Sequence, residues 1–161
     1  MEVKMNDLPK RKLIRLPEYD YSQNNYYFVT ICTHNKQHLF GMGEHVTAYG
    51  LCAEKHLHRI NSFFPCVRVD KYVVMPNHIH AIIAIEQNPA ARKNACPTPT
   101  LGTVIGNYKA AVSREIHRID PNQIVWQTRY YDHVIRNQQD YEAVWQYIDE
   151  NPLKWELDEY N

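Results

Sequence analysis

The sequence lacks any apolar run approaching the roughly 18 residues needed to cross a bilayer, and residues 1–25 are too charged for a secretory signal. Glycine is scarce, with 5 residues against 12 tyrosines in a chain of 161, which argues against a low-complexity chain and favours an ordered fold. We therefore expect a soluble cytoplasmic protein, and the length favours one domain over residues 1–161.

The chain also lacks paired cysteines and net charge. Its 4 cysteines show no C-x-x-C spacing, which predicts neither a disulfide framework nor a cysteine-based zinc site. Lys plus Arg and Asp plus Glu both number 18, so no global attraction to nucleic acid is expected. An N-terminal arm over residues 1–25 is locally basic and could neutralise backbone phosphates, although a solvated terminal segment explains it equally well. Its basic residues include Lys10, Arg11, Lys12 and Arg15.

Hydrophobic periodicity predicts the element order β-α-β-β-α-β-α. Strands are expected at 26–33, 66–75, 79–85 and 126–135, and helices at 46–64, 101–119 and 140–151, where Pro152 ends the last one. Pro76-Asn77 predicts a hairpin turn, Thr100 can cap the second helix, and residues 86–100 indicate a mobile connection. This order fits a ferredoxin-like α+β fold, a split β-α-β antiparallel sheet with helices on one face.

Two histidines interrupt the apolar run YVVMPNHIHAIIAI. Side chains alternate faces along a strand, so His78 and His80 project to one side with Ile79 opposite, where two neutral imidazoles can share a divalent cation. The alternative is a pair of polar residues at the exposed start of a strand.

A second H-x-H pair, His56 and His58, falls in a predicted helix, where residues two apart point about 200° apart. We expect that pair to be solvent-exposed surface. Because two histidines are too few to hold a catalytic metal, the remaining ligands must come from elsewhere. The carboxylates, the amides and the other histidines all stay open, including His34, His117 and His133.

Four segments between Arg15 and Trp155 carry a family resemblance: RLPEYDYSQNNYYFVTICTHNKQHLFG, YVVMPNHIHAII, VIGNYKAAVSREI and WQTRYYDHVIRNQQDYEAVWQYIDENPLKW. Together they resemble the single-tyrosine HUH transposases, most closely the REP-associated tyrosine transposase branch of the insertion-sequence enzymes. The most specific elements are M-P-N-H-x-H and the downstream Tyr-Ile-x-x-Asn-Pro. The resemblance implies an enzyme that cuts and rejoins single-stranded DNA at hairpin or palindromic ends through a 5′-phosphotyrosine, with bound Mg²⁺ or Mn²⁺.

The resemblance assigns roles residue by residue. It makes His78 and His80 metal ligands, Tyr147 on the final helix the nucleophile, and Asn151 the amide ligand that is often glutamine in relatives. Tyr147 and Asn151 are i and i+4 neighbours off the centre of the helix's apolar stripe, so both could face a site beside the sheet. That stripe is expected to comprise Tyr141, Val144, Trp145 and Ile148. Tyr147 could instead be a surface aromatic, and Asn151 a helix C-terminal residue before proline.

DNA contacts are expected from basic residues and from aromatic rings that stack on unpaired bases. The candidates are Lys10, Arg11, Lys12, Arg15, Lys109, Arg129, Tyr130, Tyr131 and Arg136. The two tyrosines also suit a half-buried strand, and Lys109 a solvated helix face. The partner would be single-stranded DNA with hairpin ends in the nucleoid, with monomer and homodimer both open. Two rival functions remain: a non-catalytic single-stranded nucleic-acid-binding module and a metal-dependent hydrolase that uses water.

Overall fold

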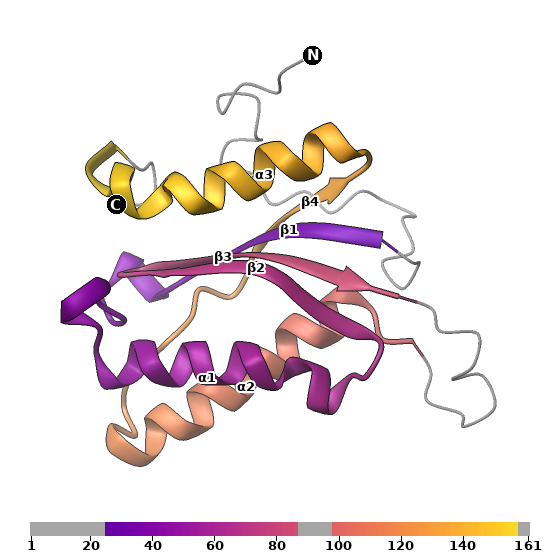
Figure 1. The fold of residues 1–161 in the computed structure, drawn as a ribbon. Helices are drawn as coiled ribbons and strands as arrows, with labels where there is room; N and C mark the ends of the chain where they lie inside the picture. The colour runs from indigo at the N-terminus through magenta and orange to yellow at the C-terminus, as the bar shows by residue number, and fades with distance from the viewer. Residues whose placement is uncertain (1–24, 87–97, 158–161) are drawn as a thin grey trace.

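The computed structural model describes residues 25–86 and 98–157, and Figure 1 shows its elements. Their order is β1 (Asn25–Cys32), α1 (Ala48–Phe63), β2 (Val67–Met75), β3 (His78–Ile85), α2 (Leu101–Ile119), β4 (Tyr131–Ile135) and α3 (Gln138–Glu150). Short 3-10 helices occupy His34–Lys36 and Gly43–His45, and a longer one, Asn151–Leu157, follows α3 directly. The predicted element order is therefore confirmed, although β4 begins later than the composition of residues 126–135 suggested.

The strands form one 4-stranded sheet in the order β2-β3-β1-β4. β1 pairs antiparallel with both β3 and β4, and β2 pairs antiparallel with β3. Each helical crossover, α1 and then α2, skips one strand, which is the split β-α-β arrangement expected from the sequence. The predicted α+β class is confirmed, and so is the tight hairpin turn, because Met75 and His78 are direct partners across Pro76-Asn77.

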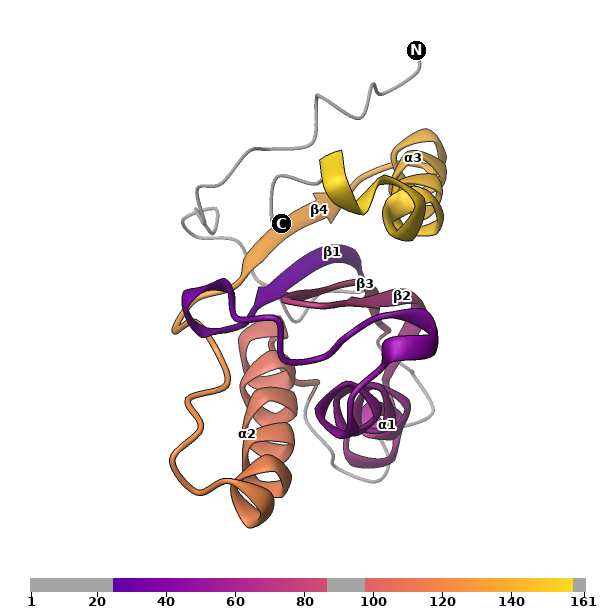
Figure 2. The same cartoon turned by 90° about the vertical axis from the view of Figure 1, so that its left-hand side faces the viewer.

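Helices cover both faces of this sheet. Figures 1 and 2 show α1 and α2 together on one side and α3 on the other. The sequence placed helices on one face, which holds for α1 and α2 but not for α3. The reason is that β1 and β3 carry apolar side chains on both of their faces. Val29 and Ile83 belong to the core under α1 and α2, whereas Phe28 and Ile82 pack with α3. The central strands are therefore buried on both sides.

Helix ends follow ordinary capping chemistry. The hydroxyl of Thr47 accepts from the Gly50 amide at 3.1 Å, and Thr100 accepts from Thr103 at 3.1 Å, which confirms Thr100 as a cap. Asn137 caps α3 through its side-chain oxygen and the Asp140 amide at 2.8 Å. These caps define where each helix begins, and for α3 that start determines which residues face the sheet.

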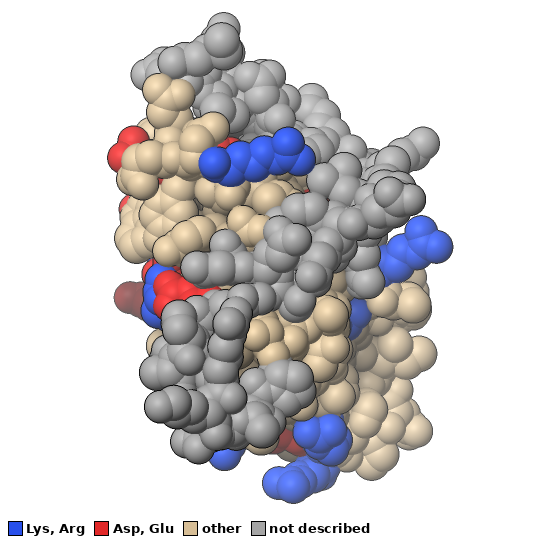
Figure 3. Space-filling model, turned by 90° about the vertical axis from the view of Figure 1, so that its right-hand side faces the viewer, with Lys and Arg blue, Asp and Glu red and all other residues tan. Residues whose placement is uncertain are grey.

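Some sequence predictions fall outside the described residues. The four basic candidates of the arm, Lys10, Arg11, Lys12 and Arg15, belong to residues 1–24, and most of the expected connection belongs to residues 87–97. Within residues 25–86 and 98–157, no helix is long and apolar enough to span a membrane. On the face drawn in Figure 3, the described Lys and Arg side chains lie at separate places and do not gather into one patch.

Candidate active site

The histidine pair lies on the face of the sheet that α3 covers. His78 and His80 are both fully buried, and their ring centroids are 4.5 Å apart. His80 stands opposite Thr30 of β1 and Val73 of β2. The expectation that both rings share one face is confirmed, whereas the alternative of an exposed strand start is wrong, because α3 and the segment after it cover this end of β3.

Each imidazole is oriented through its Nδ1 atom. The Nδ1 of His78 is 2.7 Å from the side-chain oxygen of Asn77, and the Nδ1 of His80 is 2.8 Å from the hydroxyl of Thr30. Because an amide oxygen only accepts, the Nδ1 of His78 carries the proton and its Nε2 is the basic atom. Such an outer hydrogen bond typically fixes a metal-binding histidine, with Nε2 left to face the ion.

Burial keeps the imidazole of His80 uncharged. It lowers the pKa of His80 well below its ordinary value, and the neighbouring His78 lowers it further. A buried imidazole with a depressed pKa is neutral near pH 7, and neutral imidazole is the form that binds metals.

The aromatic ring of Tyr147 closes the site from α3. Its centroid is 5.2 Å from that of His80 and 5.8 Å from that of Phe28, both in edge-on geometry. Tyr147 is half-buried, and its ring faces the sheet as expected from its position in the helix. Phe28 also stacks on His80 at 5.3 Å, which holds the imidazole between two aromatic rings.

Asn151 lies in the sequence midway between two residues whose rings contact the histidine pair. Four residues before it, Tyr147 touches His80, and four residues after it, the Trp155 ring stacks on His78 at 5.9 Å. Asn151 is only 4 % exposed, and its Oδ1 atom is buried with no hydrogen-bond partner among the described residues. A buried acceptor without a partner is costly unless something else occupies it. Two imidazoles and an amide oxygen fit a divalent ion of borderline character.

Asn151 does not end the helical path. Its φ of −57° and ψ of −44° are helical, its backbone N–H bonds to Ile148 O, and the chain continues as the 3-10 helix Asn151–Leu157. Asn151 is thus the C-terminal cap residue of α3, as the helix-end alternative expected, although the chain keeps helical geometry there. Pro152 instead occupies the first turn of the next helix, where its missing N–H costs little.

The loop after β1 supports the Pro76-Asn77 turn, which directly precedes His78. Thr33 donates its amide to Asn77 O at 2.9 Å, and Phe40 donates to Pro76 O at 3.0 Å. Asn35 and Lys36 have φ of 50° and 54°, which non-glycine residues rarely adopt. The exposed ring of His38 meets Trp155 at 5.5 Å. Sequence reasoning did not single out Trp155 or His38; the i+8 spacing of Trp155 from Tyr147 was the available signal.

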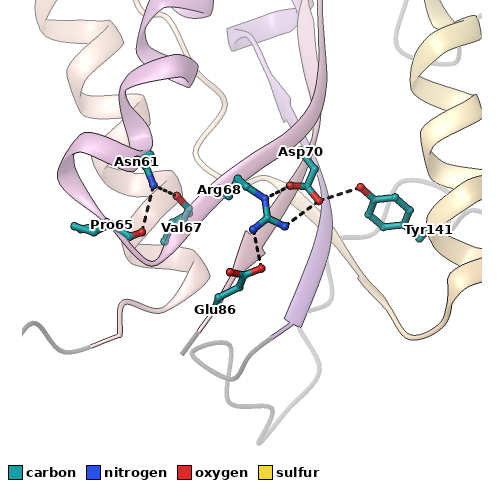
Figure 4. Close-up of polar contacts among 7 residues, drawn as sticks. All are labelled: Asn61, Pro65, Val67, Arg68, Asp70, Glu86 and Tyr141. Carbon is teal, nitrogen blue, oxygen red and sulfur yellow. Dashed lines mark hydrogen bonds and ion pairs between the residues drawn. The ribbon is translucent and has the colours of Figure 1, made fainter. Parts of the chain in front are cut away.

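A polar network fixes the first half of α3 at the edge of the sheet (Figure 4). Tyr141 donates its hydroxyl to Asp70 at 2.9 Å, and Arg68 binds both Asp70 and Glu86. Asp70 lies at an irregularity in β2, between Val69 and Lys71. Burial and the Asp70 carboxylate raise the pKa of Tyr141 to about 12.

Lys71 adds a second attachment to α3. It forms an ion pair with Asp149, and its amine lies 4.7 Å from the ring centroid of Trp145. Trp145 is 36 % exposed, so it is not part of the expected apolar stripe, whereas Val144 and Ile148 are buried as expected. The helix that carries Tyr147 is thus attached to the sheet at several points.

Three of the DNA candidates have structural roles instead. Lys109 donates to the carbonyls of Gln127 and Thr128, at 2.6 and 3.4 Å, and burial lowers its pKa. Tyr130 and Tyr131 are only 7 % and 6 % exposed. The two side chains point to opposite faces of the sheet, and helices cover both faces. These side chains are therefore not available to phosphates or unpaired bases in this structure. Arg129 and Arg136 are exposed.

The other histidine candidates have partners away from the pair. His133 binds Asp140 at 2.8 Å, and His117 binds Gln123 O at 2.8 Å. In the second H-x-H pair His58 is exposed as expected, but the His56 side chain is only 10 % exposed, which corrects the prediction for that residue. His56 groups with Cys52 and Glu115, whose ligand atoms all lie within 4.8 Å of one another. The described residues thus include a three-residue group that could hold a metal.

No family model matches the chain. It is 34 % identical over 165 residues to a Haemophilus influenzae protein described as uncharacterized, and the match covers 92 % of each chain. The chain therefore belongs to one family with that protein.

Two solved structures share the fold. A REP-associated tyrosine transposase bound to a REP hairpin superposes with a TM-score of 0.67 at 19 % identity, covering 89 % of this chain and 74 % of the other. A candidate transposase of Deinococcus radiodurans gives 0.52 at 16 % identity, covering 87 % and 97 %. The chain has the fold of the tyrosine transposases, and the resemblance noted in the sequence is confirmed at that level.

Proposed function

We propose that this chain is a transposase-type enzyme that cleaves single-stranded DNA at hairpin-flanked sites and rejoins it through a tyrosine. One observation carries the proposal: the Tyr147 ring lies 5.2 Å from the ring of His80, at a buried histidine pair. A half-buried tyrosine beside two oriented imidazoles and a buried amide oxygen combines a nucleophile with the donor set for a divalent ion. The proposed enzyme is one domain over residues 1–161.

His78 and His80 through Nε2, and Asn151 through Oδ1, would hold the ion. When bound, Mg²⁺ or Mn²⁺ supplies Lewis-acid polarisation of the scissile phosphate and neutralises charge on the leaving oxygen. Because no carboxylate is in this donor set and Mg²⁺ prefers oxygen, Mn²⁺ suits it better. Asn77 and Thr30 orient the two rings through Nδ1.

Tyr147 would be the nucleophile. A phenol with a pKa near 10 is weak at neutral pH, so attack requires loss of its proton and an activated phosphate. Its oxygen forms a bond to the 5′ phosphorus as the bond from phosphorus to the 3′ oxygen breaks, and that oxygen leaves as a 3′-hydroxyl. Attack by another 3′-hydroxyl reverses these bonds, rejoins the strands and releases the tyrosine. The phosphodiester energy is conserved, so no ATP is needed.

The substrate class follows from the resemblance and from the hairpin bound to the structural neighbour. Arg129, exposed and just before β4, lies toward the end of the sheet that carries the histidines, because Tyr131 pairs with Thr30 and Thr30 with His80. It is a better phosphate contact than Arg136, which follows the opposite end of β4. The arm residues Lys10, Arg11, Lys12 and Arg15 remain proposed contacts as well. A homodimer and association with the nucleoid stay proposals without a structural test.

The test is covalent capture. We would incubate the full chain with labelled single-stranded hairpin oligonucleotides and Mn²⁺ and analyse denaturing gels and peptide masses. The proposal expects an adduct on Tyr147 that disappears in Tyr147→Phe and His78→Ala. Tyr49→Phe and His58→Ala are matched controls, because both residues lie on α1, on the other side of the sheet, and both variants should retain the adduct.

The same experiment separates the rivals. Metal-dependent cleavage without an adduct would indicate the hydrolase that uses water, and the Tyr147→Phe variant would then still cut. Binding that needs no metal and produces no cleavage across the panel would indicate the non-catalytic module. Either result would refute the role proposed for Tyr147.

A further inference from the structure

A second group of metal-binding side chains lies on the opposite side of the sheet from the histidine pair. Cys52 and His56 are one helical turn apart on α1, so both point to the same side of that helix. Glu115 reaches them from α2, which packs beside α1 (Figure 2). One ligand atom from each of the three lies within 4.8 Å of the other two.

These side chains are enclosed to different degrees. Cys52 is 6 % exposed, and the side chains of His56 and Glu115 are 10 % and 32 % exposed. The group therefore has a buried sulfur, a nearly buried imidazole and a carboxylate that reaches solvent. This leaves a route by which an ion could enter between the helices.

The two oxygens of Glu115 are already divided between different partners. Oε2 is 2.8 Å from the His56 Nε2, and Oε1 is 2.5 Å from the Lys55 amine. An ion bound through Oε2 would leave the contact between Oε1 and Lys55 in place. A ligating carboxylate is commonly hydrogen-bonded through its second oxygen, so Lys55 supports the carboxylate rather than competing for it.

The surroundings of Cys52 do not suit a catalytic cysteine. Burial, and next the charge of Glu115, raise the pKa of Cys52 to about 11. Reactive cysteines have lowered pKa values and partial exposure, and Cys52 has neither. The thiol of Cys52 lies beside an imidazole and a carboxylate, and its surroundings do not favour the thiolate. It is therefore better suited to bind a metal ion, which displaces the thiol proton, than to act as a nucleophile.

We propose that Cys52, His56 and Glu115 form a Zn²⁺ site that joins α1 to α2. Thiolate, imidazole and carboxylate are the ligand types that zinc takes, at about 2.0–2.3 Å, and water would complete the tetrahedron. Ligand atoms of a tetrahedral zinc are about 3.3–3.7 Å apart. The thiol of Cys52 must therefore come nearer by up to roughly an ångström, and the Nε2 of His56 and the Oε2 of Glu115, now 2.8 Å apart, must separate slightly. As the sulfur–zinc bond forms, the thiol proton of Cys52 passes to solvent. The proton that the Nε2 of His56 donates to Glu115 shifts to Nδ1, which frees Nε2 for the ion. The site is separate from the proposed nuclease chemistry and does not depend on it.

The experiment uses Co²⁺ as a spectroscopic probe on the full, metal-stripped chain. A thiolate ligand gives an intense near-ultraviolet charge-transfer band, which imidazole and amide ligands do not give. We expect one equivalent of Co²⁺ to produce this band, Zn²⁺ to remove it, and Zn²⁺ to raise the melting temperature. The band should persist in His78→Ala, which distinguishes this site from the histidine pair.

Variants assign the sulfur. The band should vanish in Cys52→Ser and persist in Cys32→Ser and Cys66→Ser. If Cys52→Ser fails to fold, Glu115→Gln is the second variant, with Co²⁺ binding expected to weaken by about tenfold or more. Absence of the band in the wild-type chain, its survival in a folded Cys52→Ser, its loss in either control, or unchanged binding in Glu115→Gln would overturn the proposal.

Discussion

Asn151→Ala separates a ligand role from a structural role. The amide oxygen of Asn151 is buried without a hydrogen-bond partner among the described residues. Its removal takes away an unmet acceptor, whose burial costs about 1–3 kcal/mol, and this offsets the packing lost with the side chain. We therefore expect the metal-free variant to unfold with a free energy within about 1 kcal/mol of the wild type.

The metal response should change instead. An ion at about 100 times its Kd stabilises a protein by about 2.7 kcal/mol, and a tenfold weaker site reduces this to about 1.4 kcal/mol. At about 2–4 °C per kcal/mol for a chain of this size, the Mn²⁺-induced rise in Tm should fall from about 5–11 °C to about 3–6 °C. The assay is thermal unfolding with and without Mn²⁺, read by circular dichroism and paired with calorimetric titration. It should be run on a Cys52→Ser background so that only the histidine site contributes.

Asn61→Ala is the matched control. The amide of Asn61 donates to the carbonyls of Pro65 and Val67, at 3.2 and 3.1 Å (Figure 4). Its loss should destabilise the chain by about 1–2 kcal/mol and leave the Mn²⁺ response intact. The reasoning fails if Asn151→Ala behaves like Asn61→Ala, with lower metal-free stability and an unchanged metal response.

Three further variants test other parts of the structure. Tyr141→Phe should lower the free energy of unfolding by about 1 kcal/mol at neutral pH. Because the folded pKa of Tyr141 is raised to about 12, the wild-type advantage should be full below pH 10 and decline toward pH 12 in urea unfolding; a difference independent of pH would contradict the contact with Asp70. Lys109→Met should lower the free energy of unfolding by about 1–2 kcal/mol and leave the salt dependence of DNA binding unchanged. A weaker dependence of DNA affinity on salt, at unchanged stability, would show instead that Lys109 contacts a phosphate. Thr30→Val should weaken Mn²⁺ binding about 10- to 100-fold in calorimetry by releasing the His80 ring, and unchanged affinity would show that the hydrogen bond does not orient the ligand.

The sequence alone determined the elements and the central site pattern. Alternation along residues 78–85 placed His78 and His80 on one face, because the period of a strand is local geometry. Spacing along the last helix likewise placed Tyr147 and Asn151 together. These predictions needed no knowledge of which element packs against which.

The tertiary structure decided what covers each face. The sequence could not place α3 opposite α1 and α2, because both faces of β1 and β3 are apolar and periodicity does not choose a partner. Because helices cover both faces, Tyr131 is buried on the side of α3 and Tyr130 on the side of α1 and α2.

Long-range contacts also assigned the polar side chains whose roles differed from expectation. Lys109 met two backbone carbonyls 18 and 19 residues away in sequence. Glu115 came beside His56, 59 residues away, and Trp155 came over His78. A helix or strand pattern specifies which way a side chain points, whereas its partner depends on how distant segments pack, and only the folded chain specifies that.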